Sequence, residues 1–389
     1  MLAAIRKMKI LKRLLKIVLA LLGVLVLIIL ITIGVDSLGT NYLKINKNDP
    51  TFNNSYLIIN ANVIPMNQDT VLADKMVYIK EGIIEKIADT IEISGIQIFD
   101  AENKYLAPGL IDMHVHVWDR YELGLYLSNS VTAVRNLWGM PMHLRIKEDV
   151  VEGNIISPTF FTTGPKLTGP EFIGDDNLNL SSPAHAKEKV ISYKKRGYDL
   201  IKTYYGLDKE IFDAVIKQAK ISEIDIVAHP SQKVPFSYHL NPQIKSIEHA
   251  EEIVQQPLRF DLDTIKLQSI IDSISQSKHT SYCPTITVFN NIYQMMINDS
   301  ILDSESLNYM NPLIKKAESK KQFERWFNAK REDPATVERI KKQHEFHMTI
   351  VKKLHEAGVT IICGTDAGIV VTLTGFSIHT ELALSLIHI

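Results

Sequence analysis

The feature that most restricts the fold of this chain is a change in the hydrophobic pattern after Pro108. Short apolar runs then alternate with longer stretches of helical periodicity. Eight such runs are predicted as strands, at 110–116, 131–136, 159–163, 199–203, 224–229, 245–249, 282–288 and 359–366. Eight β/α alternations predict an α/β fold, a (β/α)8 TIM-like barrel of parallel strands over residues 108–389. The long charged stretch at about 290–345 is predicted to be helical and to cover the barrel mouth.

A different pattern precedes the barrel. From Tyr56 the runs YLIINANVIP, MVYIKEG, IIEKIAD and IQIFDAENKYLAP are short, β-branched and separated by Asn, Asp and Gly. This pattern is typical of strands and turns. Residues 55–107 are therefore predicted to form a small β-sandwich part, and the polar residues 36–54 before it are predicted to form a linker.

The N-terminus carries an apolar run without a charge, Ile17–Ile33, after six basic residues and before the first acidic residue, Asp36. A run of about 17–20 apolar residues can span a bilayer. Residues 1–35 are therefore predicted to be an uncleaved transmembrane anchor, with a cleaved signal peptide as the alternative. Basic flanks stay in the cytoplasm, so the remainder is predicted to be extracytoplasmic, in the periplasm or at the cell surface.

Charge and cysteine content exclude two further classes. Without the six basic residues of the N-terminal flank, 37 basic residues face 44 acidic ones, a formal charge of −7. This balance argues against a nucleic-acid partner, which would require a basic face. Cys283 and Cys363 lie far apart in apolar runs, so buried free thiols are predicted rather than a disulfide framework.

Polar side chains stand at the ends of five predicted strands. They are His114 and His116 on the first strand, Lys202 on the fourth, His229 on the fifth, His249 on the sixth and Asp366 on the eighth. Residues i and i+2 of a strand face the same side, so the first two imidazoles can reach one ion. Functional groups of a closed barrel gather at the C-terminal ends of its strands. The spacing therefore predicts a metal site.

The motifs PGLIDMHVH, VTAVRNLWG, IKTYYG, VAHP, SIEHAEE, GTDAG and GFSIHTEL resemble the amidohydrolase superfamily, within it the imidazolonepropionase-like and Xaa-Pro-dipeptidase-like branch. The resemblance covers about residues 56–384. A metallohydrolase of the β-lactamase type is disfavoured, because its His-x-His-x-Asp-His pattern is not matched. Here Asp119 falls one place late and no histidine follows it.

The resemblance implies a metal-dependent hydrolase of C–N bonds in a small amide, a dipeptide or a cyclic amide. It implies that His114, His116 and Asp366 hold one Zn²⁺, and that His229 and His249 hold a second. Lys202, carboxylated by CO₂, would bridge the two ions. A one-metal site with unmodified Lys202 stays open, as does a barrel homologue that binds metal or ligand without turnover. Asp366 would be the general base.

Substrate contacts are predicted for three residues. Tyr204 follows Lys202 by two and faces the same side, and the guanidinium of Arg135 could pair with a substrate carboxylate. Either residue could instead brace a neighbouring loop. His379, in GFSIHTEL, resembles a family position near the site.

Other candidates are given structural roles. His344 and His347 are predicted to lie on a solvated helix face, and Asp112 to fix the loop of the first strand by hydrogen bonds. Trp118 and Trp138 fit either an apolar pocket or the core.

The C-terminus departs from the family pattern, whose members continue into a last barrel helix and then complete the small β unit. The ending LSLIHI is also what a sequencing-library transposon end would encode. A truncated barrel with residues 385–389 artefactual, and an incomplete small β domain, is therefore expected. A homo-oligomer is compatible with the sequence.

Overall fold

The computed structural model describes residues 2–46, 54–171 and 177–386, in two units, Met1–Ile45 and Asn46–Ile389. Most of the predicted linker, residues 47–53, and residues 387–389 of the expected artefactual end lie outside the described residues.

The first unit consists mainly of one helix, α1 (Leu2–Gly39), followed by a 3-10 turn, η1 (Asn41–Leu43). The helix runs four residues beyond the predicted anchor. Its part from Met8 to Gly39 is long and apolar enough to cross a membrane. It is the only such helix in the part of the chain that the structure describes, and a signal sequence would have the same character.

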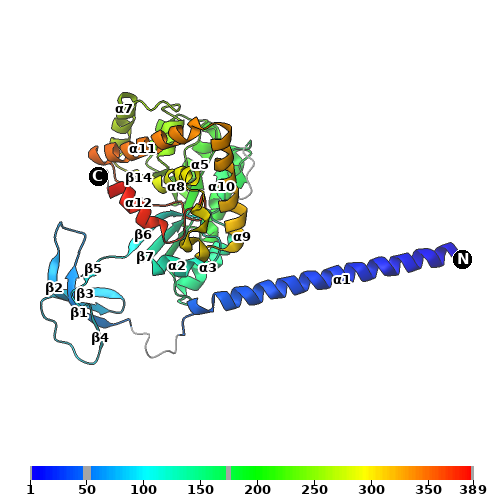
Figure 1. The fold of residues 1–389 in the computed structure, drawn as a ribbon, viewed down its shortest axis with the longest axis horizontal. Helices are drawn as coiled ribbons and strands as arrows, with labels where there is room; N and C mark the ends of the chain where they lie inside the picture. The colour runs from blue at the N-terminus through cyan, green and yellow to red at the C-terminus, as the bar shows by residue number, and fades with distance from the viewer. Residues whose placement is uncertain (1, 47–53, 172–176, 387–389) are drawn as a thin grey trace. The chain divides into compact units, whose positions relative to one another are not determined.

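The residues predicted as a small β-sandwich part form one five-stranded sheet. Its strands are β1 (Tyr56–Val63), β2 (Leu72–Lys80), β3 (Ile83–Ala88), β4 (Gln97–Asp100) and β5 (Tyr105–Leu106). The order is β3-β2-β1-β4, with β5 also paired to β1 (Figure 1). One face buries Ala61, Val63, Val77 and Ile79.

The barrel strands form two parallel sheets. One contains β6 (Leu110–Val115), β7 (Val131–Asn136) and β8 (Thr159–Thr162) in that order. The other has the order β10-β9-β11-β12-β13-β14, and its strands are β9 (Lys166–Thr168), β10 (Asn177–Asn179), β11 (Leu200–Thr203), β12 (Asp225–Ala228), β13 (Ile244–Glu248) and β14 (Ser281–Cys283). A parallel bridge between Thr163 and Leu200 connects the two sheets on one side.

The predicted eighth strand is an extended segment with isolated bridges rather than a regular strand. Ile362 donates its N–H to Tyr282 of β14 at 2.9 Å, and Met113 of β6 donates to Cys363 at 2.9 Å. The segment therefore bonds to both sheets. Its ladder is irregular because Gly364 lies against Cys283 and His114, and Asp366 takes a left-handed φ of 59°.

Helices lie against these strands (Figure 1). They are α2 (Glu122–Ser128), α3 (Pro141–Val151), α4 (Pro183–Arg196), α5 (Lys209–Ile221), α6 (Glu251–Gln255), α7 (Thr264–Ser275), α8 (Ile286–Ile297), α11 (Ala335–Glu356) and α12 (Ser377–Leu386), with the 3-10 turn η2 (Phe236–Leu240). The main core packs strand residues such as Ile201, Ile226 and Ile247 against helix residues such as Phe212 and Ile271. The fold is of the TIM-barrel type.

The seventh strand is shorter than the predicted 282–288. It ends at Cys283, and α8 begins at Ile286. Pro284 cannot donate to a ladder, and the apolar residues Ile286, Phe289 and Ile292 then recur at helical spacing and are buried.

The stretch predicted to be helical and charged is mostly helical. It contains η3 (Ile301–Asp303), η4 (Glu305–Tyr309), α9 (Pro312–Ile314), the π-helical turn η5 (Lys315–Ser319) and α10 (Lys320–Glu332).

The prediction of a solvated face for His344 and His347 is wrong. Both are buried on α11, and the ring of His347 meets that of Phe289 on α8 edge-on, with centroids 4.4 Å apart. Packing of α11 against α8 removes this face from water.

Candidate metal centre

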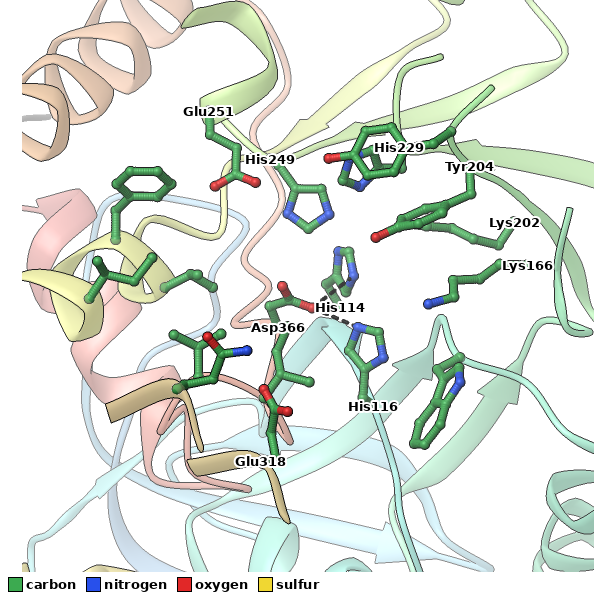
Figure 2. Close-up of a pocket in the computed structure, with 18 of the residues that line it drawn as sticks. His114, His116, Lys166, Lys202, Tyr204, His229, His249, Glu251, Glu318 and Asp366 are labelled. Carbon is green, nitrogen blue, oxygen red and sulfur yellow. Dashed lines mark ion pairs between the residues drawn. The ribbon is translucent and has the colours of Figure 1, made fainter. Parts of the chain in front are cut away.

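Two histidines and an aspartate form the centre of the site. Nε2 of His116 lies 2.7 Å from Oδ1 of Asp366, and Nε2 of His114 lies 3.2 Å from the same oxygen. All three residues are buried, and their ligand atoms could hold one ion (Figure 2). His114 is on β6 and His116 follows its end by one residue, so alternation along this extended segment directs both imidazoles to one side. The Asp366 N–H donates to the His114 carbonyl at 2.8 Å.

The remaining predicted ligands lie beside this group. The ring centroid of His249 is 4.7 Å from that of His114 and 4.6 Å from that of His229. Lys202, on β11, is fully buried. Within the described residues, the Lys202 Nζ and the His229 Nδ1 are buried without a hydrogen-bond partner. An unsatisfied buried polar atom costs about 1–3 kcal/mol, so these two atoms fit a site that holds an additional group.

Each of three imidazoles has one nitrogen held by an oxygen. His114 Nδ1 lies 2.8 Å from Glu248, His229 Nε2 lies 2.8 Å from Glu252, and His249 Nδ1 lies 2.8 Å from the Thr285 hydroxyl. Such partners fix the ring orientation and the tautomer of metal-binding histidines. The opposite nitrogen of each ring is thereby left as the potential ligand.

The protonation states suit a cation. Burial, reinforced by the nearby Lys202, lowers the pKa of His114 to about 4, and burial also lowers the pKa values of His229 and His249. Burial raises the pKa of Asp366, but His114 and His116 outweigh this and hold it well below its usual range. Neutral imidazoles and an ionised carboxylate are the forms that bind metals.

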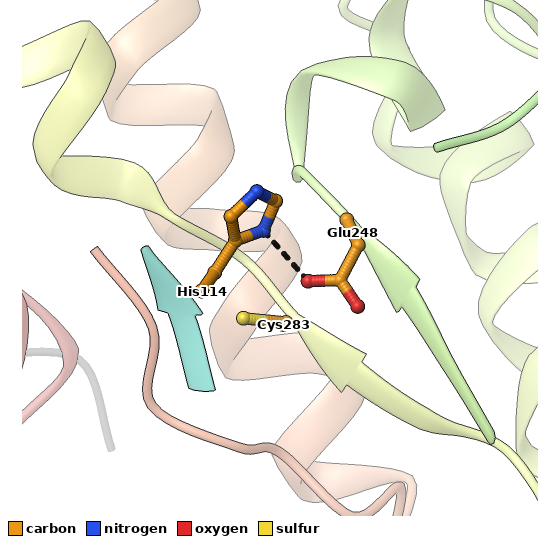
Figure 3. Close-up of side chains that lie close together, drawn as sticks. All are labelled: His114, Glu248 and Cys283. Carbon is orange, nitrogen blue, oxygen red and sulfur yellow. Dashed lines mark hydrogen bonds and ion pairs between the residues drawn. The ribbon is translucent and has the colours of Figure 1, made fainter. Parts of the chain in front are cut away.

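A second group of possible metal ligands, His114 with Glu248 and Cys283, shares His114 with the first group (Figure 3). Burial raises the pKa of the Cys283 thiol well above its ordinary value, so the sulfur keeps its proton. The Glu248 carboxylate already accepts hydrogen bonds from Arg135 Nη2 at 2.9 Å and from the Ser246 hydroxyl, and it contacts His114 Nδ1. Glu248 of this group therefore fixes the orientation of the His114 ring.

Arg135 is directed away from the cavity. Its guanidinium donates to the Met113 carbonyl at 2.6 Å, to Ser246 at 3.0 Å and to Glu248. The predicted contact with a substrate carboxylate is therefore not available in this geometry, because the donors are committed within the barrel. Arg135 instead connects β6 to β13 inside the barrel, whereas the alternative prediction was that it braces a loop.

The other predicted residues fall into two groups. Tyr204, Trp118 and Trp138 line the cavity, and the Tyr204 ring centroid is 4.5 Å from that of His229. His379 is exposed on α12 and does not line it. Asp112 accepts hydrogen bonds from the backbone and hydroxyl of Thr365 at 3.1 and 2.7 Å, in agreement with its predicted structural role.

The cavity has a volume of about 630 Å³. Apolar residues of α8 and the segment after Asp366 form one wall: Val288, Phe289, Ile292, Ile369 and Val370. Ionisable residues that the sequence did not single out also line it: Lys166, Glu251, Glu318 and Arg325. Glu251 could have been found, since it follows His249 by two in SIEHAEE, whereas nothing in the sequence singles out Lys166.

No family model matches the chain. Among curated proteins, a dihydroorotase of Carboxydothermus hydrogenoformans is 46% identical over 63 residues, and one of Listeria innocua is 42% identical over 62 residues. Each match spans 16% of this chain and 14% of the relative. The likeness to these relatives is therefore confined to a small part of their length.

Solved structures match over most of the chain. A bottromycin amidohydrolase superposes with a TM-score of 0.71 at 21% identity, over 90% of this chain and 79% of the other. A Xaa-Pro dipeptidase gives 0.61 at 18% identity, over 86% and 84%, and a putative prolidase from Bifidobacterium longum gives 0.62 at 18% identity, over 86% and 78%. The predicted resemblance is confirmed: the chain has the fold of the amidohydrolase superfamily. The names of these proteins agree with the predicted class, hydrolases of C–N bonds.

Proposed function

We propose that this chain is a metal-dependent hydrolase that cleaves the C–N bond of a small amide or dipeptide. The observation that carries the proposal is the convergence of His114, His116 and Asp366 with His229, His249 and Lys202 at one cavity. These side chains come from strands far apart in sequence. Buried neutral imidazoles around a carboxylate and a lysine are otherwise a costly arrangement.

His114, His116 and Asp366 would hold one divalent cation, and His229 with His249 a second. The nitrogen and carboxylate donors suit Zn²⁺. Lys202, as a carboxylated lysine, would bridge the two, which explains its buried Nζ without a hydrogen-bond partner. Burial lowers the pKa of Lys202 to about 8, so a fraction of the amine is neutral near neutral pH and able to react with CO₂. With unmodified Lys202, the same residues would form a one-cation site. The metal-to-protein ratio distinguishes this site from the two-cation site.

Bound cations at such a site polarise the scissile carbonyl and make water more acidic. The chain's own contribution to proton transfer is Asp366. Its carboxylate, held ionised beside two imidazoles, would accept the proton of the attacking water and deliver it to the leaving nitrogen.

Ionisable groups on two sides of the cavity favour a dipeptide over a cyclic amide. Lys166 and Glu251 lie on opposite sides of the cluster of His114 and Asp366 (Figure 2). The Lys166 ammonium is 4.6 Å from the Tyr204 ring centroid, so a cation and a phenol share one side. A substrate carboxylate would bind there, in the role first assigned to Arg135. Burial raises the pKa of Glu251 to about 8, and a substrate ammonium bound beside it would favour its ionised form.

The helix α1 would act as a signal anchor. With its basic residues retained in the cytoplasm, the barrel would face the extracytoplasmic side. A cleaved, secreted form is the alternative, and the mass of the mature protein distinguishes the two.

The test combines metal content with turnover. The full chain in detergent is loaded with Zn²⁺, the metal-to-protein ratio is measured, and hydrolysis is followed for a panel of dipeptides with their N-acetyl and C-terminal amide derivatives. We expect bound zinc and hydrolysis of free dipeptides. Lys166→Met should raise KM for free dipeptides and leave the C-terminal amides unchanged, whereas Lys104→Met, an exposed lysine of the small sheet, should change neither. Stoichiometric zinc without hydrolysis of any compound would instead support the non-catalytic alternative.

A further inference from the structure

The last helix of the described chain contacts the start of α8 through one buried carboxylate. Glu381 of α12 accepts hydrogen bonds from the backbone N–H of Ile286 at 3.0 Å and of Thr287 at 2.8 Å, and from the Thr287 hydroxyl at 2.7 Å. Its side chain is fully buried. These amides belong to the first turn of α8, where backbone donors lack intrahelical partners, so Glu381 satisfies them from another element.

The residue directly before this turn contacts the metal centre. The hydroxyl of Thr285 lies 2.8 Å from Nδ1 of His249. Thr285 has a φ of 48°, in the left-handed region that a β-branched residue rarely adopts. A strained residue of this kind persists only when its surroundings hold it. On its C-terminal side, the Thr285 carbonyl accepts from the Val288 N–H at 3.3 Å. The next two amides, of Ile286 and Thr287, are bonded to Glu381.

Strand β14, which precedes this turn, holds the backbone of His249, which is itself left-handed with a φ of 72°. The His249 N–H donates to the Cys283 carbonyl at 2.8 Å, and the Tyr282 hydroxyl donates to the His249 carbonyl at 2.9 Å. Residues of β14 therefore hold the His249 backbone, and Thr285, between β14 and α8, contacts its side chain.

We propose that Glu381 is a positioning residue for the metal centre, acting on His249 through the first turn of α8 and the Thr285 hydroxyl. The proposal rests on the proposed function, because it assigns His249 as a ligand. It explains why α12 carries an acidic residue in a fully buried position, where burial raises the pKa of Glu381 to about 7.

The test uses the full chain with Zn²⁺ and, separately, Co²⁺, and compares Glu381→Gln, Glu381→Ala and Thr285→Val. Zinc affinity is measured by competition with a chelator, and the visible spectrum of the Co²⁺ protein reports ligand geometry without turnover. We expect Glu381→Ala and Thr285→Val each to weaken zinc binding by about 10–100-fold, the range for lost partners of metal ligands, and to alter the Co²⁺ spectrum. Glu381→Gln should recover part of the affinity, because its amide oxygen still accepts a bond.

The matched control is Asp263→Ala. Asp263 also caps a helix, accepting from Ile265 at 2.7 Å and Lys266 at 3.1 Å at the start of α7, but it does not line the cavity. This variant should lower thermal stability and leave both metal readouts unchanged.

Two results would overturn the proposal. One is a Glu381→Ala protein that is less stable but has wild-type zinc affinity and Co²⁺ spectrum, since Glu381 would then be a helix cap only. The other is a double variant, Glu381→Ala with Thr285→Val, whose losses add in full, because residues acting through one path are not additive. If the proposed function is wrong, the wild-type protein hydrolyses no compound of the panel. Zinc affinity and the Co²⁺ spectrum would still test the role of Glu381 in that case.

Discussion

The carboxylate of Glu248 connects stability to metal binding, and its replacement tests both. Its Oε1 accepts hydrogen bonds from Arg135 and Ser246, and its Oε2 lies within hydrogen-bond distance of His114 Nδ1. The Glu248 side chain is fully buried. Glu248→Ala would leave the buried guanidinium of Arg135 without its countercharge. Breaking a buried ion pair on one side costs about 3–5 kcal/mol, so we expect a loss of that size in the free energy of unfolding.

Glu248→Gln separates the two roles. The amide oxygen can still accept from Arg135 or Ser246, but the negative charge that orients His114 is lost. Loss of such a partner typically weakens metal affinity by about 10–100-fold, equivalent to about 1.4–2.7 kcal/mol. The double variant Arg135→Met with Glu248→Leu should regain most of the stability, since an apolar pair can replace a buried ion pair. It should not regain the metal affinity.

The assays are thermal and denaturant unfolding of the metal-free chain in detergent, and chelator competition for Zn²⁺. Glu188→Gln is the control, because Glu188 is exposed and pairs only with Lys189 among the ion pairs of the described residues. A Glu248→Ala protein that loses less than about 1 kcal/mol, the range of a surface pair, would refute the reasoning on the ion pair. Unchanged zinc affinity in Glu248→Gln would refute the orienting role.

Three further predictions follow from the site and its surroundings. Asp366→Asn should abolish measurable hydrolysis of the dipeptide panel, because the base and a ligand are removed together; near-normal kcat would exclude Asp366 as the base. Lys202→Ala should lose metal, measured by elemental analysis, and short carboxylic acids should partly restore both metal and turnover; no rescue would argue against a carboxylated lysine. Burial raises the pKa of Glu122 from 4.5 to about 8, so the carboxyl stays protonated in the folded chain at neutral pH. The contribution of Glu122 to stability is complete below pH 4.5, the pKa in the unfolded chain, and is lost as the pH rises through 8. Glu122→Gln should therefore match the wild type at pH 4 and gain stability relative to it up to pH 9, and a pH-independent difference in melting temperature would contradict the assignment.

Much of the fold follows from local patterns. The strand positions depend on apolar runs between turn signals, and a polar residue at or near the C-terminal end of a run is placed at one end of the barrel, independently of the loops. This is why His114, Lys202, His229, His249 and Asp366 come together at one cavity. The first seven predicted strands all correspond to observed ones, although the seventh is shorter than predicted.

The remaining features depend on packing between distant segments, which a single sequence does not display. Arg135 turns inward because Glu248, on another strand, offers it a buried acceptor. His347 is buried because α8 lies against α11, where the ring of Phe289 meets it. The role of Lys166 depends on the short strand β9 beside β11, and no motif marks it.

The proposed function requires that the six side chains share bound cations. A crystal structure of the zinc-loaded chain, with anomalous scattering recorded on both sides of the zinc absorption edge, tests it most directly. We expect anomalous density within coordination distance of His114, His116 and Asp366, and also beside His229 and His249 when two ions are bound. Density at other residues, or a zinc-loaded chain in which Asp366 and His249 contact no ion, would contradict it.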